Sequence, residues 1–207
     1  MYNSRVVTID DEPATIAAAA NGDMGAFDLL VREHQAAVFR VAYLLLRDSA
    51  AAEDVAQETF LRAHRSLGTF RESQPLRPWL LRIATNLALN EIRSRQRRNG
   101  WLGRLRLVRE RPPDTPESLA MAADHMRELD AALSRLPPRD RAVLYLRYFL
   151  ELDEREMAAA LNCAPGTVKS RLHRASARLR TVIETRYPGL VPAHQRQDEE
   201  EPGDATS

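Results

Sequence analysis

The sequence predicts an all-α protein: two small helical domains joined by a flexible basic linker, with a helix-turn-helix in the second domain. Apolar residues recur every three or four positions over much of the 207 residues, and no segment alternates apolar and polar residues as a strand would. A stretch rich in arginine and proline separates the two helical regions. We therefore expect a mobile segment at 1–22, domains at 23–98 and 125–187, a linker at 99–124 and a disordered acidic tail at 188–207.

Three helices are expected in the first domain. Apolar side chains return at helical spacing from Phe27 to about residue 47, and a second helix is expected at about 50–65. The segment 68–75 begins with glycine and ends with proline, which predicts a turn. A long helix should then cover about 76–98.

The second domain begins after residues that break helices. Pro112, Pro113 and Pro116 interrupt the arginine-rich stretch, which favours a linker over a continuous helix. Helical spacing resumes at about 125–134 and again at about 139–150.

The segment 153–180 has the pattern of helix, short turn and second helix. Asp153 can cap the first helix, and Glu156 stands at the position that completes a capping box. Pro165 suits the first turn of the second helix, whose free N–H groups Thr167 can satisfy. At 100° per residue the second helix has one apolar stripe, formed by Val168, Leu172, Ala175 and Leu179.

The opposite face of that second helix is polar and basic, and residues 167–180 contain no acid. An α-helix fits the major groove of duplex DNA, where arginine can address guanine while flanking cations hold phosphates. The alternative is a solvated basic helix on a packed bundle. The residues that we expect to contact duplex DNA are Thr167, Lys169, Ser170, Arg171, His173, Arg174 and Arg178.

Charge is segregated along the chain although the formal net charge is only +1. Residues 93–111 contain eight arginines against one glutamate, while residues 198–204 contain five acids and no base. Such blocks indicate a surface that binds a polyanion and an acidic tail. That tail could fold back on the basic helix and compete with phosphate, or it could be a solvated tail.

The lone Cys163 excludes a disulfide within the chain and a cysteine-rich zinc site. Its position in the turn favours a packing role, with a redox role as the alternative. The sequence contains no signal peptide and no apolar run of membrane-spanning length, so we expect a cytoplasmic protein without membrane insertion. No catalytic residues, metal ligands or cofactor are expected.

The helix at 76–98 predicts a second nucleic-acid surface. One stripe of this helix combines arginine, asparagine and one tryptophan, which suits unpaired DNA better than a duplex groove. The loop before it could help to hold a base that has left its stack. The alternative is a half-buried tryptophan beside a solvated polar face. The candidate residues for single-stranded DNA are Phe70, Arg71, Trp79, Arg82, Asn86, Asn90 and Arg93.

The helix at 50–65 mixes acids with apolar residues that we expect to be exposed. This pattern favours a face that docks another protein, and the alternatives are an ordinary solvated face or a carboxylate metal site. The candidate docking residues are Asp54, Gln57, Glu58, Phe60 and Leu61.

Three segments in order resemble the extracytoplasmic-function (ECF) sigma factors of the bacterial sigma-70 family. Residues 54–63 look like region 2.2, and Phe70-Arg71 with residues 79–86 and Asn90 looks like regions 2.3 and 2.4. Residues 136–180 look like region 4. The resemblance implies a subunit that directs promoter-specific transcription initiation by core RNA polymerase and catalyses nothing itself.

In that family the first domain binds the clamp helices of the β′ subunit and reads the melted −10 element. The second domain reads the −35 element as duplex and contacts the β flap. The resemblance also suggests an anti-sigma factor as a partner. A different possibility from the residues alone is a stand-alone helix-turn-helix regulator, but such a protein has no need for a surface that stacks unpaired bases.

Overall fold

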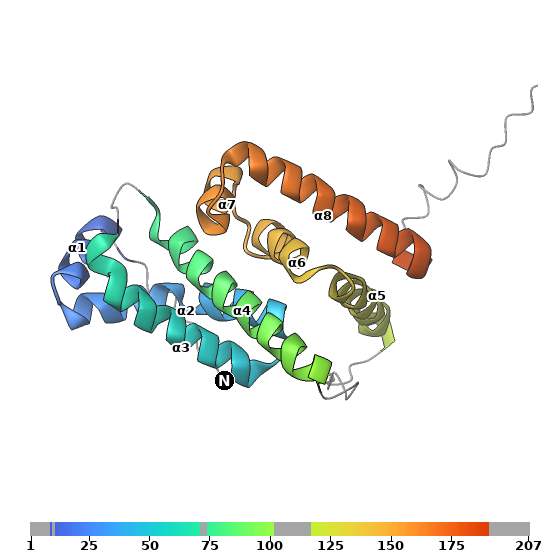
Figure 1. Ribbon diagram of the computed structural model, residues 1–207, viewed down its shortest axis with the longest axis horizontal. Coiled ribbons are helices and arrows are strands. Elements are labelled where there is room, and N and C mark those ends of the chain that lie inside the picture. The colour runs from blue at the N-terminus through green and yellow to red at the C-terminus, as the bar shows by residue number, and fades with distance from the viewer. Residues whose placement is uncertain (1–8, 10, 71–73, 102–116, 191–207) are drawn as a thin grey trace, which may run out of the picture.

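The computed structural model describes residue 9 and residues 11–70, 74–101 and 117–190. Helices α1–α4 form one domain and helices α5–α8 form a second domain beside it, with α4 facing the second domain (Figure 1). The described ranges contain helices and no strand, which confirms the expected all-α class. Arg71, the middle of the expected linker (102–116) and most of the acidic tail (191–207) lie outside the described residues.

The first domain consists of α1 (Glu12–Ala20), α2 (Met24–Leu46), α3 (Ser49–Ser66), a short 3-10 turn η1 (Leu67–Thr69) and α4 (Leu76–Trp101). Aspartates cap the first three helices: Asp11 accepts from the N–H of Ala14 at 3.0 Å. Asp23 likewise accepts from Gly25 at 2.8 Å, and Asp48 accepts from Ala51 at 3.1 Å. Each bond satisfies an N–H group that has no partner within its own helix.

Helix α1 corrects the expectation that residues 1–22 are a mobile segment. Residues 12–20 form a helix that packs on α2 and buries Ile16 and Ala19. The sequence does not indicate this buried face, because the helix ends in four alanines and alanine contributes little to an apolar periodicity. Glu12 Oε1 and the buried His34 Nε2 lie 3.0 Å apart and join α1 to α2. Burial lowers the pKa of His34, and the neighbouring Glu12 opposes that shift.

The core of the first domain lies between α2, α3 and α4, the three helices with the most extensive mutual packing. The first half of α4 is largely buried, and the helix packs on α2 and α3 of its own domain and on α7 of the second domain. The core side chains of α4 are Leu76, Leu80, Leu81, Ala84 and Ala88.

The second domain consists of α5 (Glu117–Ser134), α6 (Pro138–Leu144), a π-helical turn η2 (Tyr145–Phe149), α7 (Glu154–Leu161), α8 (Pro165–Arg186) and a 3-10 turn η3 (Pro188–Leu190). Helix α5 begins within the expected linker, and α4 ends three residues later than expected. The single helix expected at 139–150 is instead α6 followed by η2, where the N–H of Leu150 donates to the carbonyl of Tyr145 at 3.0 Å. No described helix is both long enough and apolar enough to cross a bilayer.

Candidate nucleic-acid interface

Helices α7 and α8 and the turn between them form the expected helix-turn-helix. Both bonds of the predicted capping box are present: the N–H of Glu156 donates to Asp153 at 2.8 Å, and the N–H of Asp153 donates to Glu156 at 2.9 Å. Asn162 ends α7 in the left-handed conformation with a φ of 48°. The start of α7 and the direction of the chain after it are therefore fixed by local interactions.

The start of α8 differs from the expectation in one respect. Pro165 occupies the first helical turn as predicted, but no side chain caps the helix, whose capping residue is Ala164. Thr167 lies inside the first turn, and its N–H donates to the carbonyl of Ala164 at 2.9 Å. The predicted capping role of Thr167 is therefore wrong.

The apolar stripe of α8 faces the protein as predicted. Val168 and Ala175 are fully buried, and Leu172 and Leu179 pack partly buried against the same core. This burial fixes the rotation of α8 about its axis. Because α8 runs along the outer side of the second domain, its opposite face points to solvent (Figure 1).

That solvent-facing side carries most of the residues expected to contact duplex DNA. Lys169, Ser170, His173 and Arg174 are exposed, while Thr167 and Arg171 are half-buried at its edges. The guanidinium of Arg174 donates from Nε to the carbonyl of Ser170 at 3.2 Å, within the same helix. The face is thus a ridge of short polar and long basic side chains.

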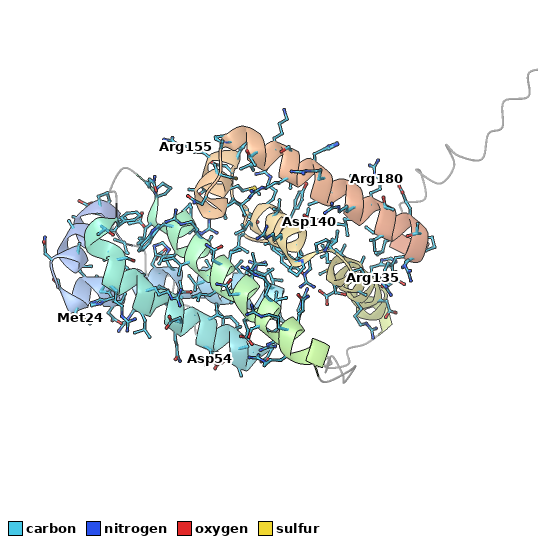
Figure 2. The ribbon with its side chains drawn as sticks, in the orientation of Figure 1. Met24, Asp54, Arg135, Asp140, Arg155 and Arg180 are labelled. Atoms are coloured by element: carbon cyan, nitrogen blue, oxygen red, sulfur yellow. The ribbon has the colours of Figure 1, made fainter. Side chains whose placement is uncertain are left out.

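Arg178 has a partner that the sequence did not suggest. Its guanidinium forms an ion pair with Asp140, whose side chain is 19% exposed and lies between α6 and α8 (Figure 2). The pair uses Nη1 alone, and the Arg178 side chain is 57% exposed, so its other donors stay accessible to a phosphate.

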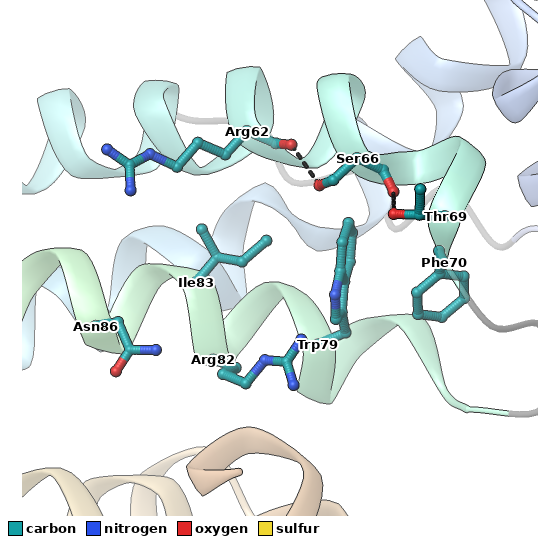
Figure 3. Close-up of a pocket in the computed structure, with 8 residues that line it drawn as sticks. All are labelled: Arg62, Ser66, Thr69, Phe70, Trp79, Arg82, Ile83 and Asn86. Carbon is teal, nitrogen blue, oxygen red and sulfur yellow. Dashed lines mark hydrogen bonds between the residues drawn. The ribbon is translucent and has the colours of Figure 1, made fainter.

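A pocket of about 440 Å³ lies between α3 and the first half of α4 (Figure 3). It brings together Phe70, Trp79, Arg82 and Asn86, four of the residues predicted to bind single-stranded DNA. Asn90 and Arg93 are exposed farther along α4 and do not line this pocket; Arg93 Nη2 donates to Asn90 Oδ1 at 2.6 Å. The predicted stripe is therefore divided into a pocket and an extension along the helix.

Four further residues of the pocket were not predicted: Arg62, Ser66, Thr69 and Ile83. The hydroxyl of Ser66 donates to the carbonyl of Arg62 at 2.7 Å, and that of Thr69 donates to the carbonyl of Ser66 at 2.8 Å. Ile83 is on α4 itself, whereas Arg62, Ser66 and Thr69 lie on α3 and η1 and reach the predicted stripe only because α3 packs on α4. The pocket combines aromatic walls with cationic and amide donors, a combination that suits an unstacked base.

Trp79 is more buried than a free stacking plane would be. The residue is 8% exposed, and its ring centroid lies 4.9 Å from that of Phe70 with a 53° angle between the planes. The indole stands between α3 and α4 as a wall of the pocket (Figure 3). The ring is therefore a wall of the pocket and not a freely exposed stacking plane, and its contact with single-stranded DNA stays a prediction.

The predicted docking face lies on α3. Asp54 and Gln57 are exposed, Leu61 is 52% exposed, and Asp54 lies on the side of α3 that faces away from the second domain (Figure 2). Glu58 accepts from Nε of Arg62 at 2.7 Å and so connects this face to the pocket. Phe60 is half-buried against the core.

No group of three or more histidine, cysteine or acidic residues is placed to hold a metal ion in the part of the chain that the structure describes. Cys163 is half-buried in the turn between α7 and α8 and packs against the core.

Two family models match the chain. Sigma-70 region 2 matches residues 30–98, and sigma-70 region 4 matches residues 126–179. The first match contains α3, the pocket and α4 up to residue 98, and the second contains α7 and α8 up to residue 179.

Named relatives match most of the chain. It is 37% identical over 185 residues to the ECF RNA polymerase sigma factor SigE of Mycolicibacterium smegmatis, covering 84% of this chain and 69% of that protein. It is 35% identical to the ECF RNA polymerase sigma factor SigL of Mycobacterium tuberculosis, covering 83% of this chain and 96% of the relative. Among solved structures, CnrH in complex with the cytosolic domain of CnrY has a TM-score of 0.62 and 26% identity, covering 84% and 98% of the two chains.

We predict that Trp79→Ala destabilises the first domain by about 3–5 kcal/mol, because it removes a large buried ring. Asn86→Ala, which changes an exposed side chain of the same pocket, should alter stability by no more than about 0.5 kcal/mol. Thermal denaturation followed by circular dichroism measures both. Equal melting temperatures for the two variants would contradict the structural role of Trp79.

Proposed function

Because the chain belongs to the ECF sigma factors of the sigma-70 family, we propose that it reads promoters with two separate surfaces. The exposed face of α8 reads the −35 element as duplex, and the pocket between α3 and α4 holds a base of the melted −10 strand. Membership of this family shows that the chain is a sigma factor that acts in transcription initiation. What we propose is the assignment of the −35 element to residues of α8 and of the −10 strand to residues of the pocket.

The observation that carries this proposal is the composition of the pocket. Phe70 and Trp79 supply aromatic walls, while Arg82 and Asn86 supply hydrogen-bond donors at its mouth. A duplex base pair cannot enter such a recess, but a base that has left its stack can. This feature favours a promoter-opening subunit over a stand-alone regulator that reads duplex alone.

The face of α8 supports the assignment to the −35 element. Its apolar stripe is buried, so Lys169, Ser170 and Arg174 are presented together on the outer side of the second domain. Arginine can form two hydrogen bonds to guanine in the major groove, and lysine can hold a phosphate. Arg174 is the residue that we assign to base reading, with Lys169, Arg171 and Arg178 assigned to phosphates.

The acidic and apolar face of α3 is proposed to bind core RNA polymerase, at the clamp helices of its β′ subunit. Leu61 is an exposed large hydrophobic residue beside Gln57 and Asp54, which is a combination suited to a protein contact. The second domain is proposed to contact the β flap. The polymerase performs the nucleotidyl transfer in the cytoplasm, and this chain contributes binding energy that favours strand opening.

An anti-sigma factor is a further proposed partner. The solved relative CnrH is in a complex with the cytosolic domain of CnrY, and a second neighbour, the sigma factor RpoE of Bartonella quintana, is in a complex with the anti-sigma factor NepR. The second neighbour is 24% identical with a TM-score of 0.59, so it supports the fold.

We predict that Asn86→Ala weakens promoter opening while binding to core polymerase stays unchanged. The loss of one hydrogen bond to the −10 strand should cost about 1 kcal/mol, or roughly fivefold in the opening equilibrium. Permanganate reactivity of thymines near the start site measures opening, and co-purification measures binding to core. Gln96→Ala, an exposed amide on α4 outside the pocket, is the matched control. Normal opening by the Asn86 variant would contradict the assignment of the pocket.

We also predict different effects for two arginines of α8. Arg174→Ala should cost roughly 1–3 kcal/mol on a −35 duplex and relax specificity at one position. Arg178→Ala should weaken binding about equally across sequences and lower the salt slope by about one. Fluorescence anisotropy at several salt concentrations separates these outcomes. If both variants keep wild-type selectivity and salt dependence, α8 does not read the groove.

A further inference from the structure

Two hydroxyl groups line the α3 side of the pocket that we assign to the −10 strand. Ser66 ends α3 and Thr69 lies in η1, on the opposite wall from Arg82 and Asn86 of α4 (Figure 3). The hydroxyl of Ser66 donates to the carbonyl of Arg62 at 2.7 Å, and that of Thr69 donates to the carbonyl of Ser66 at 2.8 Å. A hydroxyl has one proton and two lone pairs. Because the proton is used inside the protein, each oxygen is left to accept a hydrogen bond from a ligand.

The other polar side chains of the pocket mainly supply donors. Arg62 uses Nε to donate to Glu58 at 2.7 Å, which leaves the N–H groups of its terminal nitrogens for a ligand. Arg82 enters from α4, and a guanidinium contains donors and no acceptor. The amide of Asn86 can donate and accept. Among the described side chains that line the pocket, the acceptors are therefore the two hydroxyl oxygens and this one amide oxygen.

The bond from a hydroxyl to a nearby carbonyl does not by itself make a binding site. Ser134 and Thr185 make the same kind of bond to carbonyls of their own helices, at 2.8 Å and 2.7 Å, and both residues are exposed outside the pocket. Serine and threonine commonly form such bonds in helices. What distinguishes Ser66 and Thr69 is their position in a recess with aromatic walls, where a base can meet the free lone pairs of the two oxygens.

The four bases form two classes according to the group that they present to such oxygens. Adenine and cytosine have an exocyclic amine, at N6 and N4, where guanine and thymine have the carbonyl oxygens O6 and O4. An amine can donate to a hydroxyl oxygen while the hydroxyl keeps its bond within the protein. A carbonyl oxygen can be bonded only after the hydroxyl has given up that bond. An amino base therefore makes one hydrogen bond more at each hydroxyl than a keto base does.

We propose that the pocket selects an amino base, adenine or cytosine, over guanine or thymine at one position of the −10 strand. Ser66 and Thr69 determine this specificity by accepting from the amine. Arg62 and Arg82 supply donors for the ring nitrogen beside the amine, which is an acceptor in both amino bases. The inference rests on the proposed function, because it requires that the pocket holds a base of that strand.

The size of the preference follows from the number of hydrogen bonds. One hydrogen bond gained on binding changes the binding constant by a net factor of about five. Ser66 is half-buried whereas Thr69 is exposed, so water competes less for the oxygen of Ser66. We expect Ser66 to contribute the larger part of the preference, about fivefold, and Thr69 a smaller part.

The test measures how tightly the complex of this chain with core RNA polymerase binds single-stranded −10 DNA. The strand carries a −10 sequence selected from randomised promoters, and fluorescence anisotropy gives the affinity. An abasic site at each position in turn identifies the base in the pocket, because at that position alone Asn86→Ala should cause no further loss. At this position adenine or cytosine should bind about fivefold more tightly than guanine or thymine.

Removing the amine from the base and the hydroxyl from the protein isolates the proposed contact. Purine in place of adenine, or 2-pyrimidinone in place of cytosine, lacks the amine and should bind the wild type about fivefold more weakly. Ser66→Ala should bind the parent base and its analogue equally, and Thr69→Val should reduce the difference in part. The matched controls Ser134→Ala and Thr185→Val remove hydroxyls that make the same internal bond outside the pocket, and should leave the difference unchanged. Thermal melting of each variant confirms that it is folded.

The preference for an amino base is wrong if the identified position prefers guanine or thymine, or if the analogue binds the wild type as tightly as its parent base. It is also wrong if Ser66→Ala and Thr69→Val both keep the full difference. If Asn86→Ala weakens binding of the intact strand while removal of the amine has no effect, the specificity is wrong and the assignment of the pocket stands. If neither Asn86→Ala nor an abasic site at any position changes the affinity, the pocket does not hold the −10 strand and the proposed function is wrong as well.

Discussion

The packing of α4 against both domains is the constraint on which the rest of the structure depends. This helix fills the core of the first domain with Leu80, Leu81 and Ala84, and it also packs on α7 of the second domain. In the first half of α4 few positions remain for polar side chains, among them the half-buried Arg82 and the exposed Asn86. Because burial on both sides fixes the rotation of α4, the residues proposed to bind the −10 strand are held in register without ordering of their own.

Features that depend on interactions within one helix could be predicted from the sequence. The capping box of α7 and the apolar stripe of α8 depend on spacings within one helix, so the sequence alone indicates them and both are confirmed. The single-strand stripe on α4 was also visible, and it led to Arg82 and Asn86 in the pocket. Helix α1 was missed because its stability comes from burial of Ile16 and the contact of Glu12 with α2.

What the sequence could not supply was the packing of one helix on another. Arg62 belongs to the pocket only because α3 lies against α4, although its pairing with Glu58 follows from their spacing of four residues. The burial of Trp79 likewise depends on the position of Phe70. The ion pairs of Arg47 with Asp130 and of Arg178 with Asp140 also join different helices, so the spacing of residues in the sequence does not indicate them.

Transcription in vitro from a library of randomised promoters tests directly whether this chain selects promoters with two separate surfaces. Core RNA polymerase is supplied with or without this chain, and the starts and sequences of the transcripts are determined. We predict that discrete starts appear only with the chain, and that the selected promoters share two elements at a constant separation, upstream near −35 and at −10. Unchanged choice of starts by core polymerase, or selected promoters that share a single duplex element alone, would contradict promoter reading by two surfaces.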